Sequence, residues 1–124
     1  MTLRRLEILQ WYALLGGALA WTSEHVLGYF VSVAGCSPPG HRWGVDAGLW
    51  GGLLLGATTV LIVLAGASAV VVFRETSAIG HDEPGPYGRL RFFAVAALVG
   101  NVLFFVLVGL DGLGSIAHLP CRQA

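Results

Sequence analysis

Three long apolar runs dominate the pattern of hydrophobic and polar positions along the chain. They cover residues 6–34, 48–73 and 92–116, and most charged side chains lie outside or at the ends of these runs. An α-helix rises about 1.5 Å per residue, so about 20 residues cross a hydrocarbon core of about 30 Å. Each run is long enough to predict a transmembrane helix. We therefore expect an all-α integral membrane protein with three transmembrane helices in a single membrane domain over residues 1–124.

The composition supports this class. Of the 124 residues, 56% are hydrophobic and 11% are charged, and the mean hydropathy is +0.75. Such a chain cannot present a normal charged soluble surface, so membrane lipid is its expected surroundings. The seven basic and seven acidic residues give a formal net charge of zero. Without a basic surface, no nucleic acid is expected as a partner.

The loops and the arginines predict an orientation. Residues 35–47 form the first connection and residues 74–91 form the second. Positively charged residues in short loops favour the cytoplasmic side of a membrane. Five arginines lie before the first helix or around the second connection, and two lie on the opposite side: Arg4, Arg5, Arg74, Arg89 and Arg91 against Arg42 and Arg122. We expect a cytoplasmic amino terminus and second connection, and an outside first connection and carboxyl terminus.

A secretory signal is the competing interpretation of the first run. The basic start, the apolar stretch and the ending Ala18-Leu19-Ala20 are typical of a signal peptide with its cleavage site. Apolar residues resume after Ala20 and continue through residue 34. This continuation favours an uncleaved transmembrane helix.

Two neighbouring ionisable residues, Glu24 and His25, interrupt the first run, and the polar residues Asn101 and Asp111 interrupt the third. Ionisable groups at membrane depth are expensive and are candidates for function. Adjacent helix positions are about 100° apart, so Glu24 and His25 are expected to point in different directions, with Trp21 and Tyr29 on the side of His25. Asp111 should reach a similar depth and could meet His25 across the bundle.

Three roles stay open for these polar residues. His25 could lock two helices together, contact a partner subunit, or serve a ligand or a proton. Glu24, which lies between small residues, is expected to be protonated, to contact water in a cavity, or to pair with another chain.

Glycines and one aspartate predict the packing and the start of the second helix. Gly48, Gly52 and Gly56 recur every four residues, and small residues at this interval let helix backbones approach closely in lipid. We expect this stripe to be a helix-contact face, toward another helix of the chain or toward a partner protein. Asp46 is expected to cap the amino terminus of the second helix.

The two cysteines, Cys36 and Cys121, follow the first and third helices and fall on the predicted outer face, where disulfides persist. A bridge between them would close most of the chain into one loop, which is worth about 4 kcal/mol in the entropy model. Two free thiols are the alternative. A further alternative is copper or zinc binding with His41 and His118 as additional ligands.

The segment GGALAWTSEHVLGYFVSVAGC, residues 16–36, and the LPC at residues 119–121 resemble parts of a known group. They are similar to small three-helix bacterial membrane proteins encoded beside cytochrome c oxidase subunits and oxidase assembly genes. The matching positions are Ala20, Trp21, His25, Gly28, Tyr29, Cys36, Pro120 and Cys121. The chain departs from the pattern at Glu24 and in its glycine- and proline-rich loop 80–88.

The resemblance implies a multi-pass protein of the bacterial inner membrane that associates with subunits of a haem–copper oxidase or a related respiratory complex. It implies an accessory subunit or an assembly helper without a known catalytic activity. No nucleophile with an adjacent base, phosphate-binding loop or complete metal-binding motif is recognisable, so we expect neither an enzyme nor a resident cofactor. The alternative is a small cofactor- or metal-binding protein, with Glu24 and His25 contacting a quinone or haem, or with the outer cysteines and histidines handling copper.

Overall fold

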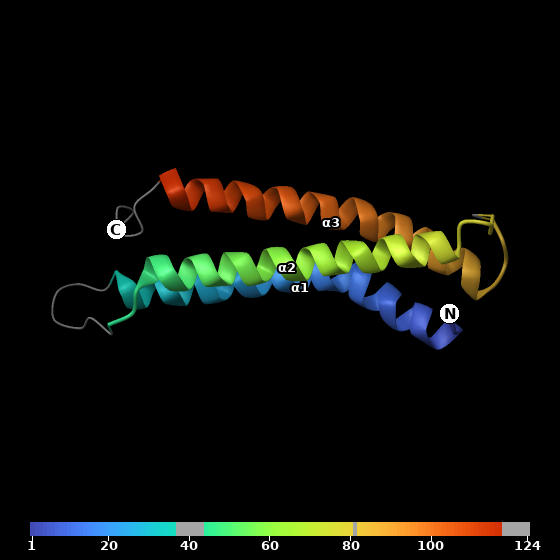
Figure 1. Ribbon diagram of the computed structural model, residues 1–124, viewed down its shortest axis with the longest axis horizontal. Coiled ribbons are helices and arrows are strands. Elements are labelled where there is room, and N and C mark those ends of the chain that lie inside the picture. Colours follow the sequence, from blue (N-terminus) through green and yellow to red (C-terminus); the bar gives the residue numbers. More distant parts are fainter. Residues whose placement is uncertain (37–43, 81, 118–124) are drawn as a thin grey trace.

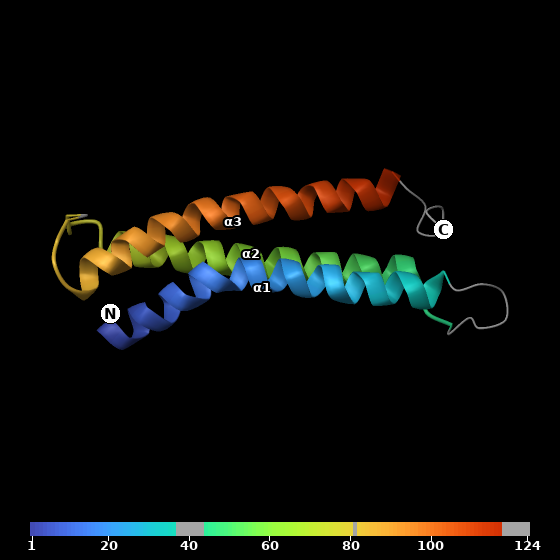
Figure 2. The ribbon, with the colours of Figure 1, turned by 180° about the vertical axis from the view of Figure 1, so that it is seen from behind.

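The computed structural model describes residues 1–36, 44–80 and 82–117, and these residues form three long α-helices (Figure 1). They are α1 (Leu3–Gly35), α2 (Ala47–Glu75) and α3 (Pro86–Ala117). The helices run side by side along one long axis, and the amino terminus lies at the end where α2 connects to α3 (Figures 1 and 2). The all-α fold predicted from the three apolar runs is confirmed.

Two of these helices, α2 with 29 residues and α3 with 32, are long and apolar enough to cross a membrane. α1 is as long, with 33 residues, but its polar run at residues 22–25 makes it less apolar. α2 and α3 therefore indicate a membrane protein. The crossing of α1 and the orientation of the chain stay predictions.

The helix ends differ from the predicted bounds mainly at the start of α3. This helix begins at Pro86 rather than at residue 92, because proline is favoured in the first turn, where its missing N–H leaves no bond unmade. Gly85 precedes it with a φ of +113°, a backbone conformation that other residues rarely adopt.

At the start of α2, Asp46 Oδ1 accepts hydrogen bonds from the N–H groups of Gly48 (3.0 Å) and Leu49 (3.1 Å). The predicted cap is confirmed.

The core of the bundle consists of three layers along its length. The fully buried residues of the middle layer are all alanines, which let the three backbones approach closely. The layer at the amino-terminal end contains Leu6, Val72, Leu90 and Ala94; the middle layer contains Ala13, Ala69 and Ala97; the layer toward the other end contains Ala20, Ile62 and Val108.

A buried asparagine joins α3 to α1 beside the middle layer. Asn101 Nδ2 donates hydrogen bonds to the carbonyl oxygen of Ala13 on α1 (2.7 Å) and to that of Ala97 on α3 (2.8 Å). Gly17 lies next to this amide, and a Cβ at position 17 would overlap Asn101 Oδ1. The contact therefore depends on both the asparagine and the missing side chain opposite it.

The glycine stripe of α2 does not pack against the other two helices. Gly52 and Gly56 have no neighbouring atom within 4 Å of the place a Cβ would take, and at Gly48 the neighbour is Asp46 Oδ1 at 3.4 Å. All three glycines are exposed. The predicted contact within the chain is thus wrong, because α2 carries a second face of small and apolar residues that makes this contact: Thr58, Ile62, Ala65, Ala69 and Val72.

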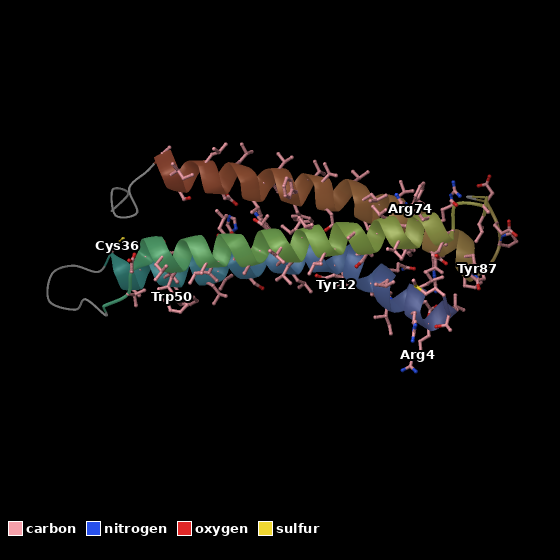
Figure 3. All side chains as sticks on the ribbon, in the orientation of Figure 1. Arg4, Tyr12, Cys36, Trp50, Arg74 and Tyr87 are labelled. Carbon is pink, nitrogen blue, oxygen red and sulfur yellow. The ribbon has the colours of Figure 1, made fainter. Side chains whose placement is uncertain are left out.

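The end of the bundle near the amino terminus is held by charged side chains. Arg91 donates hydrogen bonds to the carbonyl oxygens of Thr76 (3.0 Å) and Ser77, and its guanidinium lies 5.5 Å from the ring centroid of Phe73. Arg89 pairs with Glu7 at 3.4 Å. Arg4 and Arg74 lie at this end, and Cys36 and Trp50 lie at the opposite end (Figure 3).

We predict that Gly17→Ala destabilises the bundle by about 1–3 kcal/mol, because the added methyl group overpacks the Asn101 contact. The measurement is unfolding of the purified protein in mixed detergent micelles by circular dichroism. Gly109→Ala is the matched control, since no atom lies within 4 Å of a Cβ at that position. Equal stability of the two variants would contradict the role given to Gly17.

Candidate functional site

Three ionisable side chains converge between α1 and α3, away from the amino-terminal end. His25 Nδ1 lies 3.1 Å from Glu24 Oε2, and His25 Nε2 lies 3.9 Å from Asp111 Oδ2. One ligand atom from each of the three residues lies within 4.8 Å of the others. The expected meeting of His25 with Asp111 across the bundle is therefore present.

The directions of Glu24 and His25 differ from the prediction. Their Cα positions lie about 100° apart around the helix, but both side chains are long enough to bend toward each other. The carboxylate of Glu24 thus lies beside one ring nitrogen of His25 while Asp111 lies beside the other. The imidazole is placed between two carboxylates that come from different helices.

Two of the oxygens in this cluster are buried without a hydrogen-bond partner. Glu24 Oε2 and Asp111 Oδ2 have no hydrogen bond within the described structure, although each lies near His25. The side chain of Glu24 is 15% exposed, whereas those of Asp111 and His25 are 40% and 48% exposed. Leaving buried oxygens unpaired costs free energy, so the cluster is suited to an additional donor or cation.

Trp21 supports the imidazole, and Tyr29 does not. The rings of Trp21 and His25 lie 4.4 Å apart between centroids, and Trp21 also contacts Phe104 on α3 at 6.0 Å. The buried Nε1 of Trp21 also has no hydrogen-bond partner in the described part of the chain. Tyr29 is 68% exposed and its ring packs at the edge of Phe30.

A cavity of about 890 Å³ adjoins the cluster, and we call it the polar cavity after the ionisable groups in its lining, which is otherwise largely apolar. All three helices line it, and the glycines Gly48 and Gly52 of α2 form part of its wall. Glu24, His25 and Asp111 are the ionisable residues among the described residues that line it, apart from Tyr29. The site is therefore accessible to small polar species, and its fixed groups are two carboxylates and an imidazole.

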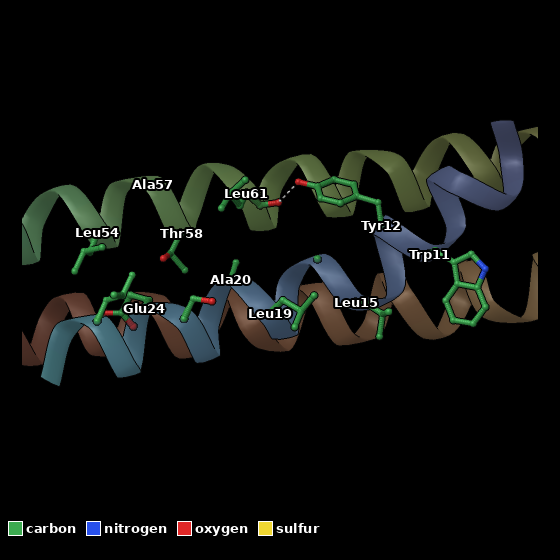
Figure 4. Close-up of a pocket in the computed structure, with 13 residues that line it drawn as sticks. Trp11, Tyr12, Leu15, Leu19, Ala20, Glu24, Leu54, Ala57, Thr58 and Leu61 are labelled. Carbon is green, nitrogen blue, oxygen red and sulfur yellow. Dashed lines mark hydrogen bonds between the residues drawn. The ribbon is translucent and has the colours of Figure 1, made fainter. Parts of the chain in front are cut away.

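A second cavity of about 560 Å³ lies between α1 and α2 and is almost entirely apolar. Its lining on α1 extends from Trp11 to Leu27, and the hydroxyl of Tyr12 donates a hydrogen bond to the carbonyl oxygen of Leu61 on α2 (3.1 Å, Figure 4). Glu24 lines both cavities. Glu24 therefore lies between the apolar cavity and the polar cavity.

The outer cysteine and histidine hypotheses involve residues outside the described ranges. Cys36 directly follows α1, and its N–H donates to the carbonyl oxygen of Ser32 at 2.9 Å. Cys121, His41 and His118 lie outside the described residues. The disulfide and the alternative copper or zinc site stay predictions.

Asn101 is recognisable in the sequence as a polar interruption of the third run, but no role was assigned to it from the sequence. Its position within the third apolar run was visible, and a lone amide in a transmembrane helix commonly hydrogen-bonds another helix. Its partner is a backbone carbonyl, which no side-chain pattern marks. Only the polar residue itself could have been identified from the sequence.

Comparisons with protein-family models, with curated proteins and with solved structures found no match to this chain.

We predict that His25 and Asp111 stabilise the fold together. A double-mutant cycle of His25→Gln and Asp111→Asn should give a favourable coupling free energy of a few tenths of a kcal/mol. It should be below the average of about 0.6 kcal/mol for hydrogen bonds between transmembrane helices, because Nε2 and Oδ2 lie 3.9 Å apart. The measurement is detergent-induced unfolding of the four proteins. Strictly additive effects would contradict the contact between α1 and α3.

We predict that Cys36 and Cys121 form an intramolecular disulfide in the native membrane. Alkylation of the non-reduced protein followed by mass spectrometry should leave both cysteines unmodified, and alkylation after reduction should modify both. Two modified cysteines without prior reduction would refute the bridge.

Proposed function

We propose that this chain is a non-catalytic accessory subunit or an assembly helper of a membrane respiratory electron-transfer complex, associated with a haem–copper oxidase. The single observation that carries the proposal is the unpartnered small-residue face of α2. Gly48, Gly52 and Gly56 are exposed at an interval that permits close helix contact, and neither α1 nor α3 covers them. A transmembrane helix of a larger subunit fits such a face.

The resemblance of residues 16–36 and 119–121 to proteins encoded beside oxidase genes supports the choice of partner. The described helices leave only short connections, so most of the surface available to a partner is the outside of the helices themselves. We place the protein in the bacterial inner membrane with three crossings, a cytoplasmic amino terminus and an outside carboxyl terminus. The concentration of charged residues at the amino-terminal end of the bundle supports this orientation.

A second candidate function is a small membrane cofactor- or metal-binding protein. The observation that favours it is the position of Glu24 and His25 at the polar cavity, where His25 also meets Asp111. A quinone headgroup, a haem or a metal ion would find polar groups there. Copper handling by the outer cysteines and histidines is a separate form of this candidate.

The experiment that tests the first proposal is purification of the chain, tagged at its amino terminus, from native membranes in mild detergent. Mass spectrometry should identify respiratory-complex subunits in stoichiometric amounts, and the optical spectrum of the eluate should contain haem bands. Elution of the chain alone and without colour would contradict the proposal.

We predict that Gly56→Leu abolishes or strongly reduces this co-purification, because a leucine side chain holds the partner helix away from α2. Gly109→Leu on α3 is the matched control: it also replaces an exposed glycine with no atom within 4 Å of a Cβ, but it lies off the stripe. Thermal unfolding should show that both variants are folded. Equal recovery of partner subunits with both variants would exclude the glycine face as the contact.

A further inference from the structure

We propose that Glu24, His25 and Asp111 form a binding site for a divalent transition-metal ion, which bridges α1 and α3 at the polar cavity. The proposal deepens the second candidate function. It does not depend on association with a respiratory complex, because it concerns groups of the isolated chain.

The separation between His25 and Asp111 matches a bridging ion better than a direct bond. Nε2 and Oδ2 lie 3.9 Å apart, which is too long for a hydrogen bond. Zinc binds histidine nitrogen at about 2.0–2.1 Å and carboxylate oxygen at about 2.0–2.2 Å. An ion bound to both atoms at these lengths would have a wide N–metal–O angle. A small inward movement of either side chain would make this angle narrower.

Glu24 lies beside the second ring nitrogen of His25. Its Oε2 lies 3.1 Å from Nδ1, without a hydrogen bond between the two atoms. Asp111 Oδ2 lies 3.9 Å from the other ring nitrogen, Nε2, so an ion bound at Nε2 would lie near a second ligand. A carboxylate on the far nitrogen of a metal-binding histidine is a common arrangement, because it fixes the tautomer and raises the basicity of the ligand. Glu24 can also rotate to become a third ligand, since all three groups offer atoms within 4.8 Å of one another.

The charge of the cluster and its two buried oxygens also favour a cation. Two carboxylates surround one imidazole, and no arginine is among the described residues lining the cavity. The oxygens Glu24 Oε2 and Asp111 Oδ2 are buried and lack hydrogen-bond donors. A divalent ion would coordinate both and neutralise their charge.

The cavity and the types of ligand indicate which ion the site would bind. Its volume of about 890 Å³ gives an ion a route of entry and leaves room for water in the remaining coordination positions. A ligand set of one imidazole and two carboxylates suits zinc and other divalent transition metals, and lacks the soft thiolate ligands that select copper(I). Zinc is the probe of choice because its affinity for such sites is high and it has no redox chemistry.

The test uses the full chain in detergent, in a background in which His41, His81 and His118 are each replaced by glutamine. His25 is then the sole histidine among the four of the sequence. Equilibrium dialysis with Zn²⁺ should give one ion per chain. His25→Gln should abolish this binding, and Asp111→Asn and Glu24→Gln should each weaken it at least tenfold. Glu75→Gln, which removes an exposed carboxylate from the other end of the bundle, should leave it unchanged.

Cobalt(II) identifies the ligands of the bound ion. Nitrogen and oxygen ligation gives visible absorption without the near-ultraviolet thiolate charge-transfer band that Cys36 or Cys121 would produce. Circular dichroism of each variant should show an unchanged helix content. Failure of the background protein to bind zinc at micromolar concentration would overturn the proposal, as would binding that all three site variants retain or that shows the thiolate band. None of these results would alter the expected co-purification with respiratory subunits.

Discussion

The hydrogen bond from the Asn101 side chain to the carbonyl oxygen of Ala13 is the constraint on which the arrangement of α1 and α3 depends. Lipid offers apolar side chains little reason to prefer one another, so helices in a membrane associate through close packing and polar contacts. The amide fixes the register of α3 against α1. Gly17 has no side chain and therefore leaves room for the amide of Asn101. Alanines in the same part of the bundle bring α2 into contact.

This register places His25 opposite Asp111. Both residues lie farther from the amino-terminal end than the asparagine contact, and there the three helices enclose the polar cavity. The opposite end is occupied by arginine contacts to carbonyl oxygens and carboxylates. One end of the bundle is therefore closed by its own charged groups, whereas the other presents ionisable groups with unsatisfied oxygens. The glycine face of α2 borders the same cavity through Gly48 and Gly52, so a helix bound there would reach the candidate metal site.

The sequence predicted the three helices and the Asp46 cap because these depend on local properties: the length of apolar runs and the chemistry of a helix start. It predicted the wrong packing face for α2. Two faces of that helix carry small residues, and their spacing alone does not show which face packs against α1 and α3. From their helix positions alone, Glu24 and His25 were predicted to point in different directions. Their side chains are long enough to approach each other in the structure. The cavity and the unpaired oxygens follow from how all three helices pack, which no single segment encodes.

The most direct test of this account is solid-state NMR of the protein in lipid bilayers, because Asn101 is the only asparagine in the chain. With ¹⁵N-labelled asparagine and ¹³C-carbonyl-labelled alanine, the side-chain nitrogen should correlate with two alanine carbonyl carbons, those of Ala13 and Ala97. The correlation with Ala13 should disappear in Ala13→Gly, where the labelled carbonyl is lost. A single correlation, with Ala97 of the same helix, would show that the amide does not join α3 to α1.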